Sequence, residues 1–122
     1  STDARLAQFV SPEDATAVYP PYTNLKFKYA ASWMADNVFM RVSEMYLTEA
    51  EALAHLNKGT EAAIVLKDLM VNRDPSWNKA SVTVDDVYTQ RRLELWGEGF
   101  ALYDHLRYIL FLCLCLYFVC CM

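Results

Sequence analysis

The sequence predicts an all-α protein, and three observations carry this prediction. Between residues 36 and 57, apolar residues recur near helical spacing, and only Glu49 interrupts the stripe. A second helical pattern follows after a turn of about three residues around Gly59. A third begins at Thr83-x-x-Asp86, which reads as a capping box with Asp in place of the usual Glu. Helices joined by short polar turns are therefore expected.

Residues 1–35 form an irregular N-terminal arm in this prediction. Pro12, Pro20 and Pro21 punctuate it, and proline disfavours helix at the residue before it. The stretch around Pro-Pro alternates aromatic and polar residues, which favours extended or edge structure. A short strand near Leu25–Tyr29 is expected.

The first long helix is predicted over residues 36–57. Asp36 or Asn37 can cap its start. Gly59 can end it by taking the left-handed conformation just past the helix. The apolar positions at helical spacing are Val38, Val42, Met45, Tyr46, Ala50, Leu53 and Ala54.

The second helix is predicted from Glu61 to Val71, with Thr60 as its cap and Pro75 closing the region. The short linker forces the two helices to pack antiparallel, as a helical hairpin. Its expected inward residues are Ala62, Ala63, Leu66, Leu69 and Met70.

Two further helices are predicted, one from Val84 to Trp96 and a short one from Phe100 to Arg107. Gly97 and Gly99, on either side of Glu98, are expected to bend the chain between them.

The hairpin resembles a tetratricopeptide-type unit. Small residues at Ala50 and Ala52, then Gly59 and Ala62, and finally Pro75, follow that repeat's sequence of close contact, tight turn and stop. A single repeat cannot bury its own faces, so we expect more helices upstream of this chain.

The overall composition narrows the class of protein. The chain has 122 residues, for which one domain is the default, and a net charge of −4. The basic residues form no stripe or run, so no nucleic-acid partner is expected. The first residues lack the layout of a signal peptide, so the signal of an exported protein would lie outside this chain.

The C-terminal tail differs from the rest. Residues 108–122 carry no charge and hold all four cysteines, Cys113, Cys115, Cys120 and Cys121. The tail is shorter than a membrane span, and no turn residue shapes it into a zinc clamp. We therefore divide the chain into a body, residues 1–107, and a tail, 108–122, that a shifted reading frame explains best.

No catalytic or metal site is predicted, and no cofactor. Glu94 and Glu98 could be imagined as a glycosidase pair, but such carboxyls must flank a bond across a cleft. Two acids on one turn beside arginines are more simply ion-paired scaffolding. His55 and His105 lack a second ligand at metal spacing, and no serine stands between glycines.

Charged residues at spacing i,i+3 are expected to hold the helices together. These pairs are Arg41 with Glu44, Arg91 with Glu94, and Asp104 with Arg107. We also expect Glu44 and Arg92 to be substantially buried between helices. The full structural set is Arg41, Glu44, Arg91, Arg92, Glu94, Glu98, Asp104 and Arg107.

Three aromatic residues are candidates for ligand binding. Trp77 lies in the polar loop DPSWNK, and Tyr19 and Tyr22 flank Pro20-Pro21. Sugars present flat C–H faces that stack on exposed rings. The alternative is that Trp77 folds back over the hairpin, because aromatic side chains usually bury most of their area.

Three segments in order resemble the RagB/SusD family. They are DARL at 3–6, FMRVSEMYLTEAEA at 39–52, and RRLELWGEG at 91–99 followed by Asp104-x-x-Arg107. The last is similar to the family's E-R-R-x-E-L-x-x-E-G-x-R-x-x-D-x-x-R signature. Gln90, Ala101 and His105 depart from it, which bears on local helix packing.

This resemblance implies a mostly helical outer-membrane lipoprotein of Bacteroidetes-type bacteria that captures glycans or other nutrients without catalysis. It implies a TonB-dependent (SusC-like) transporter as partner, and membrane attachment only through a lipid anchor that this chain does not contain. The alternative is a tetratricopeptide-like scaffold that docks proteins in the hairpin groove.

Overall fold

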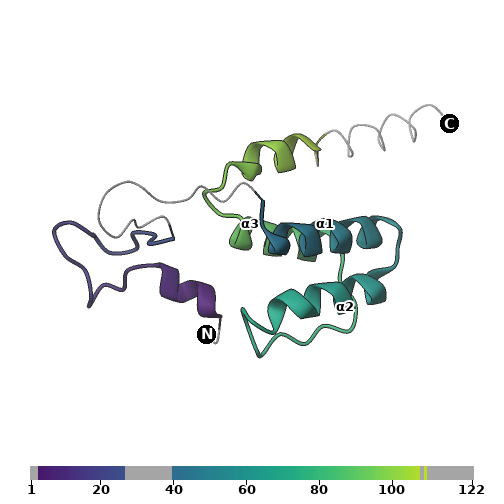
Figure 1. Cartoon of the computed structure of the whole chain (residues 1–122), viewed down its shortest axis with the longest axis horizontal. Helices are drawn as coiled ribbons and strands as arrows, with labels where there is room; N and C mark the ends of the chain where they lie inside the picture. The colour runs from purple at the N-terminus through teal and green to yellow at the C-terminus, as the bar shows by residue number, and fades with distance from the viewer. Residues whose placement is uncertain (1–2, 27–39, 108, 110–122) are drawn as a thin grey trace.

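The computed structural model describes residues 3–26, 40–107 and 109, and its elements confirm the all-α prediction. They are a 3-10 helix η1 (Ala4–Gln8), the helices α1 (Val42–His55), α2 (Gly59–Met70) and α3 (Val84–Glu94), and a helical segment over residues 100–107 (Figure 1). Within these described ranges, β structure is limited to one isolated bridge between Phe9 and Asn24.

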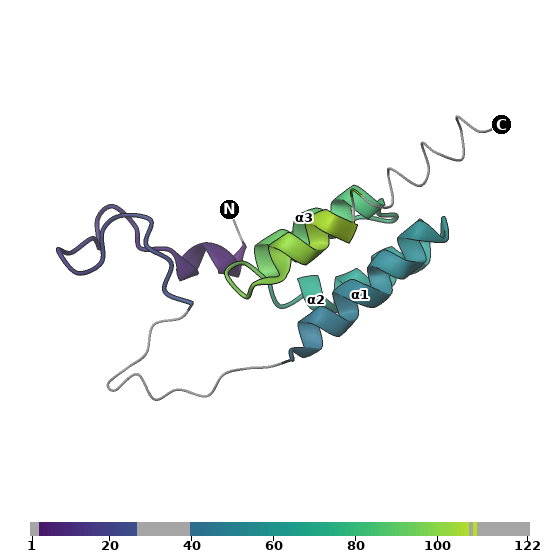
Figure 2. The same cartoon turned by 90° about the horizontal axis from the view of Figure 1, so that it is seen from above.

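Helix α1 lies at the centre of the molecule and packs against both α2 and α3. The segment 100–107 lies on the opposite side of α1 and α3 from α2 (Figures 1 and 2). The core that these helices share consists of Leu47, Ala50, Ala54, Ala62, Ala63, Leu66, Leu69, Met70, Val82, Val87 and Leu95.

The buried face of α1 differs in part from the predicted one. Ser43, Leu47, Ala50 and Ala54 point inward, whereas Val42, predicted to be inward, is 72% exposed. Met45 is exposed as well, so the prediction was wrong at these two positions. Ala50 and Ala54 are buried as the helical spacing predicted. All five residues predicted to be inward on α2 are buried.

The turn between α1 and α2 also differs from the prediction. Asn57, at φ 60°, takes the left-handed conformation predicted for Gly59. Gly59 instead begins α2, and the helix has no Thr60 cap. A β-carbon on Gly59 would lie 2.5 Å from Ser81 Oγ and 2.7 Å from the Val82 carbonyl oxygen, so glycine serves close packing here.

The other predicted helix ends lie within two residues of the observed ones, except the start of α1, which was predicted at residue 36. The Thr83–Asp86 capping box is present, with the Asp86 N–H donating to Thr83 Oγ1 at 3.2 Å. Gly97 and Gly99 have φ values of 76° and 84° and bend the chain as predicted. Helix α1 begins at Val42, and residues 40–41 are not helical. The proposed caps Asp36 and Asn37, and most of tail 108–122, lie outside the described residues.

The N-terminal arm is irregular, as predicted. The Val10 N–H donates to the Thr23 carbonyl at 2.9 Å, and the Tyr22 N–H donates to the Val10 carbonyl at 2.8 Å. Residues 25–26 of the expected strand are not strand, and residues 27–29 are not described. The Ala4 N–H donates to the Arg73 carbonyl at 2.6 Å, which ties η1 to the end of α2.

Candidate functional site

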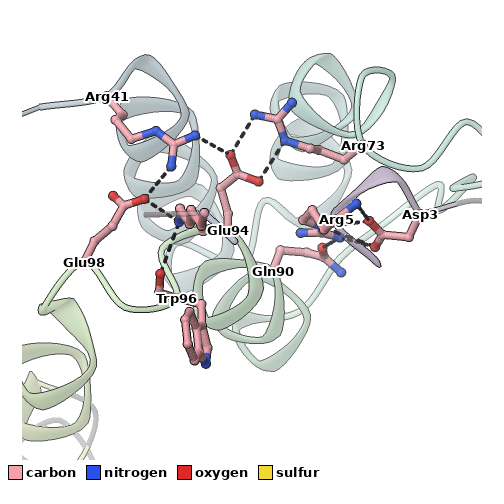
Figure 3. A network of polar contacts seen from close by, with 9 residues as sticks. Asp3, Arg5, Arg41, Arg73, Gln90, Glu94, Trp96 and Glu98 are labelled. Carbon is pink, nitrogen blue, oxygen red and sulfur yellow. Dashed lines mark hydrogen bonds and ion pairs between the residues drawn. The ribbon is translucent and has the colours of Figure 1, made fainter. Parts of the chain in front are cut away.

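Glu94, the last residue of α3, is the centre of a buried ion-pair network (Figure 3). Its side chain is only 3% exposed. Arg73 donates two hydrogen bonds to it, from Nε at 2.9 Å and from Nη2 at 2.8 Å. Arg41 adds a third from Nη2 at 3.2 Å. The carboxylate thus joins the start of α1, the end of α2 and the end of α3.

The environment of Glu94 keeps it ionised. Burial raises the pKa of this carboxyl, but the hydrogen bonds and charge of Arg73, with the charges of Arg41 and Arg5, outweigh burial and hold the pKa below its ordinary value. The same bonds raise the pKa of Arg73. A general acid in glycoside hydrolysis needs a raised carboxyl pKa, which is the opposite shift.

Glu98 belongs to the same network. It accepts a hydrogen bond from Arg41 Nη1 and pairs with Lys26 Nζ at 2.5 Å. Lys26 Nζ also donates to the carbonyl oxygens of Glu94 at 2.7 Å and Trp96 at 3.2 Å. Lys26 therefore satisfies carbonyls at the C-terminal end of α3 and ties the arm to it.

A second network joins α1, α3 and the segment 100–107. Buried Arg91 donates from Nε to Asp104 at 3.0 Å. Arg107 Nη2 bridges Asp104 at 3.1 Å and Glu51 at 2.8 Å. The predicted i,i+3 pair of Asp104 and Arg107 is thus present.

The other predicted partners need correction. Arg41 pairs with Glu94 and Glu98, not with Glu44, and Arg91 pairs with Asp104, not with Glu94. Within the described part of the chain, the ion pairs that use the signature residues connect different elements more often than turns of one helix.

The expected burial was wrong for Arg92 and holds only in part for Glu44. Glu44 is half-buried, and Arg92 is exposed, with its guanidinium 5.9 Å from the ring centre of Tyr88. The adjacent Arg91 takes the buried position instead, because a helix turns 100° per residue and only one of two neighbours can face α1.

The three predicted ligand-binding aromatics are not brought together. Trp77 is half-buried and packs against the core, as the alternative reading of that residue expected. Tyr19 is half-buried, and Tyr22 is 72% exposed. The arm that holds both tyrosines lies away from the α2–α3 connection in both views (Figures 1 and 2).

The prediction from the sequence missed a different aromatic pair. Phe9 and Trp96 meet edge to face, with ring centres 6.1 Å apart and planes at 68°. Both rings are partly exposed and line a small hollow of about 80 Å³ between the arm and the end of α3. The one feature of the sequence that could have indicated an exposed ring here is the position of Trp96 directly before Gly97.

A larger hollow of about 670 Å³ lies between the start of α1 and the end of α2. Arg41 and Arg73 line it, but both already bind Glu94. Ser43 also lines it, and its hydroxyl is buried without a hydrogen-bond partner among the residues that the structure describes.

The described residues contain no group of three or more His, Cys, Asp or Glu placed to hold a metal ion. The tail cysteines fall outside those residues. Among the helices described, none has the length and apolar character to cross a membrane.

The signature residues thus build two ion-pair networks that hold the helices together, and one family model matches the sequence that carries them. The match is to the SusD family and covers residues 22–114, about three quarters of the chain. The chain belongs to the SusD family. Membership indicates a nutrient-binding protein associated with the outer membrane. Searches among curated proteins and among solved structures found no match.

The matched range qualifies two details of the resemblance. It begins after the DARL segment at residues 3–6, and it extends past Arg107 into the first residues of the apolar tail. The division of this SusD-family chain at residue 107 remains a prediction.

Proposed function

We propose that this SusD-family chain is part of a non-catalytic subunit that captures glycans and passes them to a TonB-dependent transporter. Family membership carries the proposal. In this proposal, a lipid anchor holds the subunit at the outer membrane. The transporter, the glycan and the anchor are all elements of the proposal.

The ion-pair networks support the absence of catalysis. Glu94 and Glu98 share Arg41 as a partner. Arg73 also binds both oxygens of Glu94, and Lys26 joins Arg41 on Oε1 of Glu98. Neither carboxyl faces a partner across an open cleft, which glycoside hydrolysis requires. Both acids therefore serve the fold.

The test is binding without turnover. The full chain is incubated with maltohexaose, cellohexaose, xylohexaose and mannohexaose, while calorimetry measures binding and chromatography measures cleavage. Binding of at least one oligosaccharide with no cleavage is expected. Cleavage that Glu98→Gln abolishes at unchanged melting temperature would contradict the proposal.

A docking scaffold is the second candidate function, and one observation favours it. Val42 and Met45 are exposed near the start of α1, and the exposed Leu56 directly follows its last residue. Exposed apolar residues of this kind fit a protein partner better than a sugar. If so, the chain would bind none of the four hexasaccharides, and polar substitutions at Val42 and Met45 would abolish capture of a co-expressed protein partner.

A further inference from the structure

Trp96 lies at the surface of the molecule, where backbone contacts position it. Its carbonyl oxygen accepts from Lys26 Nζ at 3.2 Å, and the positive φ of Gly97 turns the chain immediately after it. Its indole points away from the ion-pair network (Figure 3), meets the edge of Phe9 and remains 49% exposed. A flat apolar ring therefore faces solvent beside Phe9, at a position that the backbone fixes.

The hollow beside this ring combines apolar and amide groups. Leu6 and Leu93 extend the apolar wall that Phe9 and Trp96 begin. Gln8 and Asn24 add amide groups, which can donate to and accept from hydroxyl groups.

The two charged residues at the hollow neutralise each other. Asp3 and Arg5 pair at 2.7 Å, and the hydrogen bond from Arg5 holds the pKa of Asp3 below its ordinary value. Asp3 is therefore ionised at neutral pH, and the pair carries no net charge. The site does not favour a ligand of either sign.

We propose that this hollow is a subsite for one ring of a neutral glycan, which stacks its C–H face on Trp96 and hydrogen-bonds to Gln8 and Asn24. The inference rests on the proposed function and gives it a location. An aromatic face with a few convergent polar groups is the usual composition of a small-molecule site.

The size of the hollow limits what enters it. At about 80 Å³ it is far below the roughly 300–1,000 Å³ of pockets that enclose a drug-sized ligand. The sugar ring must therefore lie over the indole in the open, and only a substituent such as a hydroxymethyl group enters the hollow. Such a subsite binds weakly alone and contributes to affinity as one contact among several.

The experiment compares two tryptophans of the full chain. Calorimetry measures the Kd of wild type, Trp96→Ala and Trp77→Phe for the same four hexasaccharides. Trp96→Ala is expected to raise Kd about tenfold, in the range of a lost aromatic contact. Trp77→Phe, at the tryptophan that packs against the core, should leave Kd within about twofold. Quenching of tryptophan emission by sugar should vanish only in Trp96→Ala.

Leu93→Trp provides a second variant that removes no contact of Trp96. Leu93 is half exposed and lines the hollow, so the larger side chain fills it and should also raise Kd. If circular dichroism shows that Trp96→Ala does not fold, the binding of Leu93→Trp tests the subsite in its place. Unchanged binding by the folded variants overturns the subsite and leaves the proposed function standing. Failure of the wild-type chain to bind any of the four sugars overturns both.

Discussion

Arg73 and Glu94 form a two-hydrogen-bond pair between the end of α2 and the end of α3, at 2.8 and 2.9 Å. Arg73 stands just outside α2 in a turn, and its own carbonyl accepts from the Ala4 N–H of η1. One residue thus connects the arm, α2 and α3. Within the described residues, the pair is the best-buried bidentate contact across elements.

We predict strong coupling between these two residues. Removal of one partner from a buried ion pair costs about 3–5 kcal/mol of unfolding free energy, because the other charge stays buried. Arg73→Ala and Glu94→Ala should each fall near the lower end of that range, since Arg41 remains and Arg73 is partly exposed. Urea unfolding of both single variants and the double variant measures the coupling, expected at about 1–3 kcal/mol.

The exposed pair Lys58–Glu61 is the matched control for this cycle. Both side chains are about half exposed and 3.3 Å apart. Its coupling should stay below about 1 kcal/mol. Equal coupling in the two cycles would show that burial contributes nothing to the Arg73–Glu94 pair.

Arg91 and Arg92 provide a second, sharper comparison. They are neighbours of the same type, yet Arg91 is buried on Asp104 and Arg92 is exposed. We expect Arg91→Ala to lower the unfolding free energy by about 3 kcal/mol or more. Arg92→Ala should change it by less than about 1 kcal/mol, since its contact with Tyr88 is at the surface. Similar losses in the two variants would contradict the helix register described above.

The sequence predicted the elements better than their contacts. Helical spacing, the Thr83–Asp86 box and the two glycines after α3 are local signals, and each identifies its element, although some helix ends differ. Ion-pair partners depend on which elements meet in space. Spacing therefore revealed the Asp104–Arg107 pair, whereas Arg73 and Lys26, which come from loops, carry no local pattern that marks them.

The aromatic residues illustrate the same limit. A loop tryptophan was a reasonable candidate for an exposed ring, but Trp77 gains more contact by packing on the core. Trp96 was predicted to lie within a helix. It is exposed because α3 ends at Glu94 and Gly97 redirects the chain. The exposed ring thus follows from a helix end that periodicity located two residues too late.

Gly59 yields a prediction that reverses simple helix propensity. It lies in the first turn of α2, where alanine would normally stabilise by up to about 1 kcal/mol. A β-carbon there would meet the Val82 carbonyl at 2.7 Å, and the Val82 N–H is bonded to the Gly59 carbonyl at 3.1 Å. Gly59→Ala should therefore destabilise the chain by about 1–3 kcal/mol, measured by thermal unfolding.

Gly99→Ala separates this clash from backbone strain. Gly99 has positive φ, but a β-carbon there meets no atom of the described residues within 4 Å. Gly99→Ala should therefore lower the unfolding free energy by about 1 kcal/mol, from the strain of the left-handed backbone alone. A stabilising Gly59→Ala variant would mean that the 81–82 segment moves away easily.

Glu94 also predicts how stability responds to acid. Its folded pKa lies below the ordinary value of 4.5, so the ionised carboxylate stabilises the fold at higher pH. That contribution is lost as pH falls below 4.5 and through the folded pKa. Glu94→Gln should thus be much less stable than wild type at about pH 7, and the difference should narrow towards about pH 3.

Urea unfolding at several pH values checks this narrowing, with Glu61→Gln as control because that side chain is exposed. The control should track wild type throughout. Some acid sensitivity will remain in Glu94→Gln, since hydrogen bonds from Arg5 and Lys79 hold the pKa values of Asp3 and Asp86 below their ordinary values as well. If the Glu94→Gln difference were constant with pH, the carboxylate would act through its shape and hydrogen bonds, and its charge would not stabilise the fold.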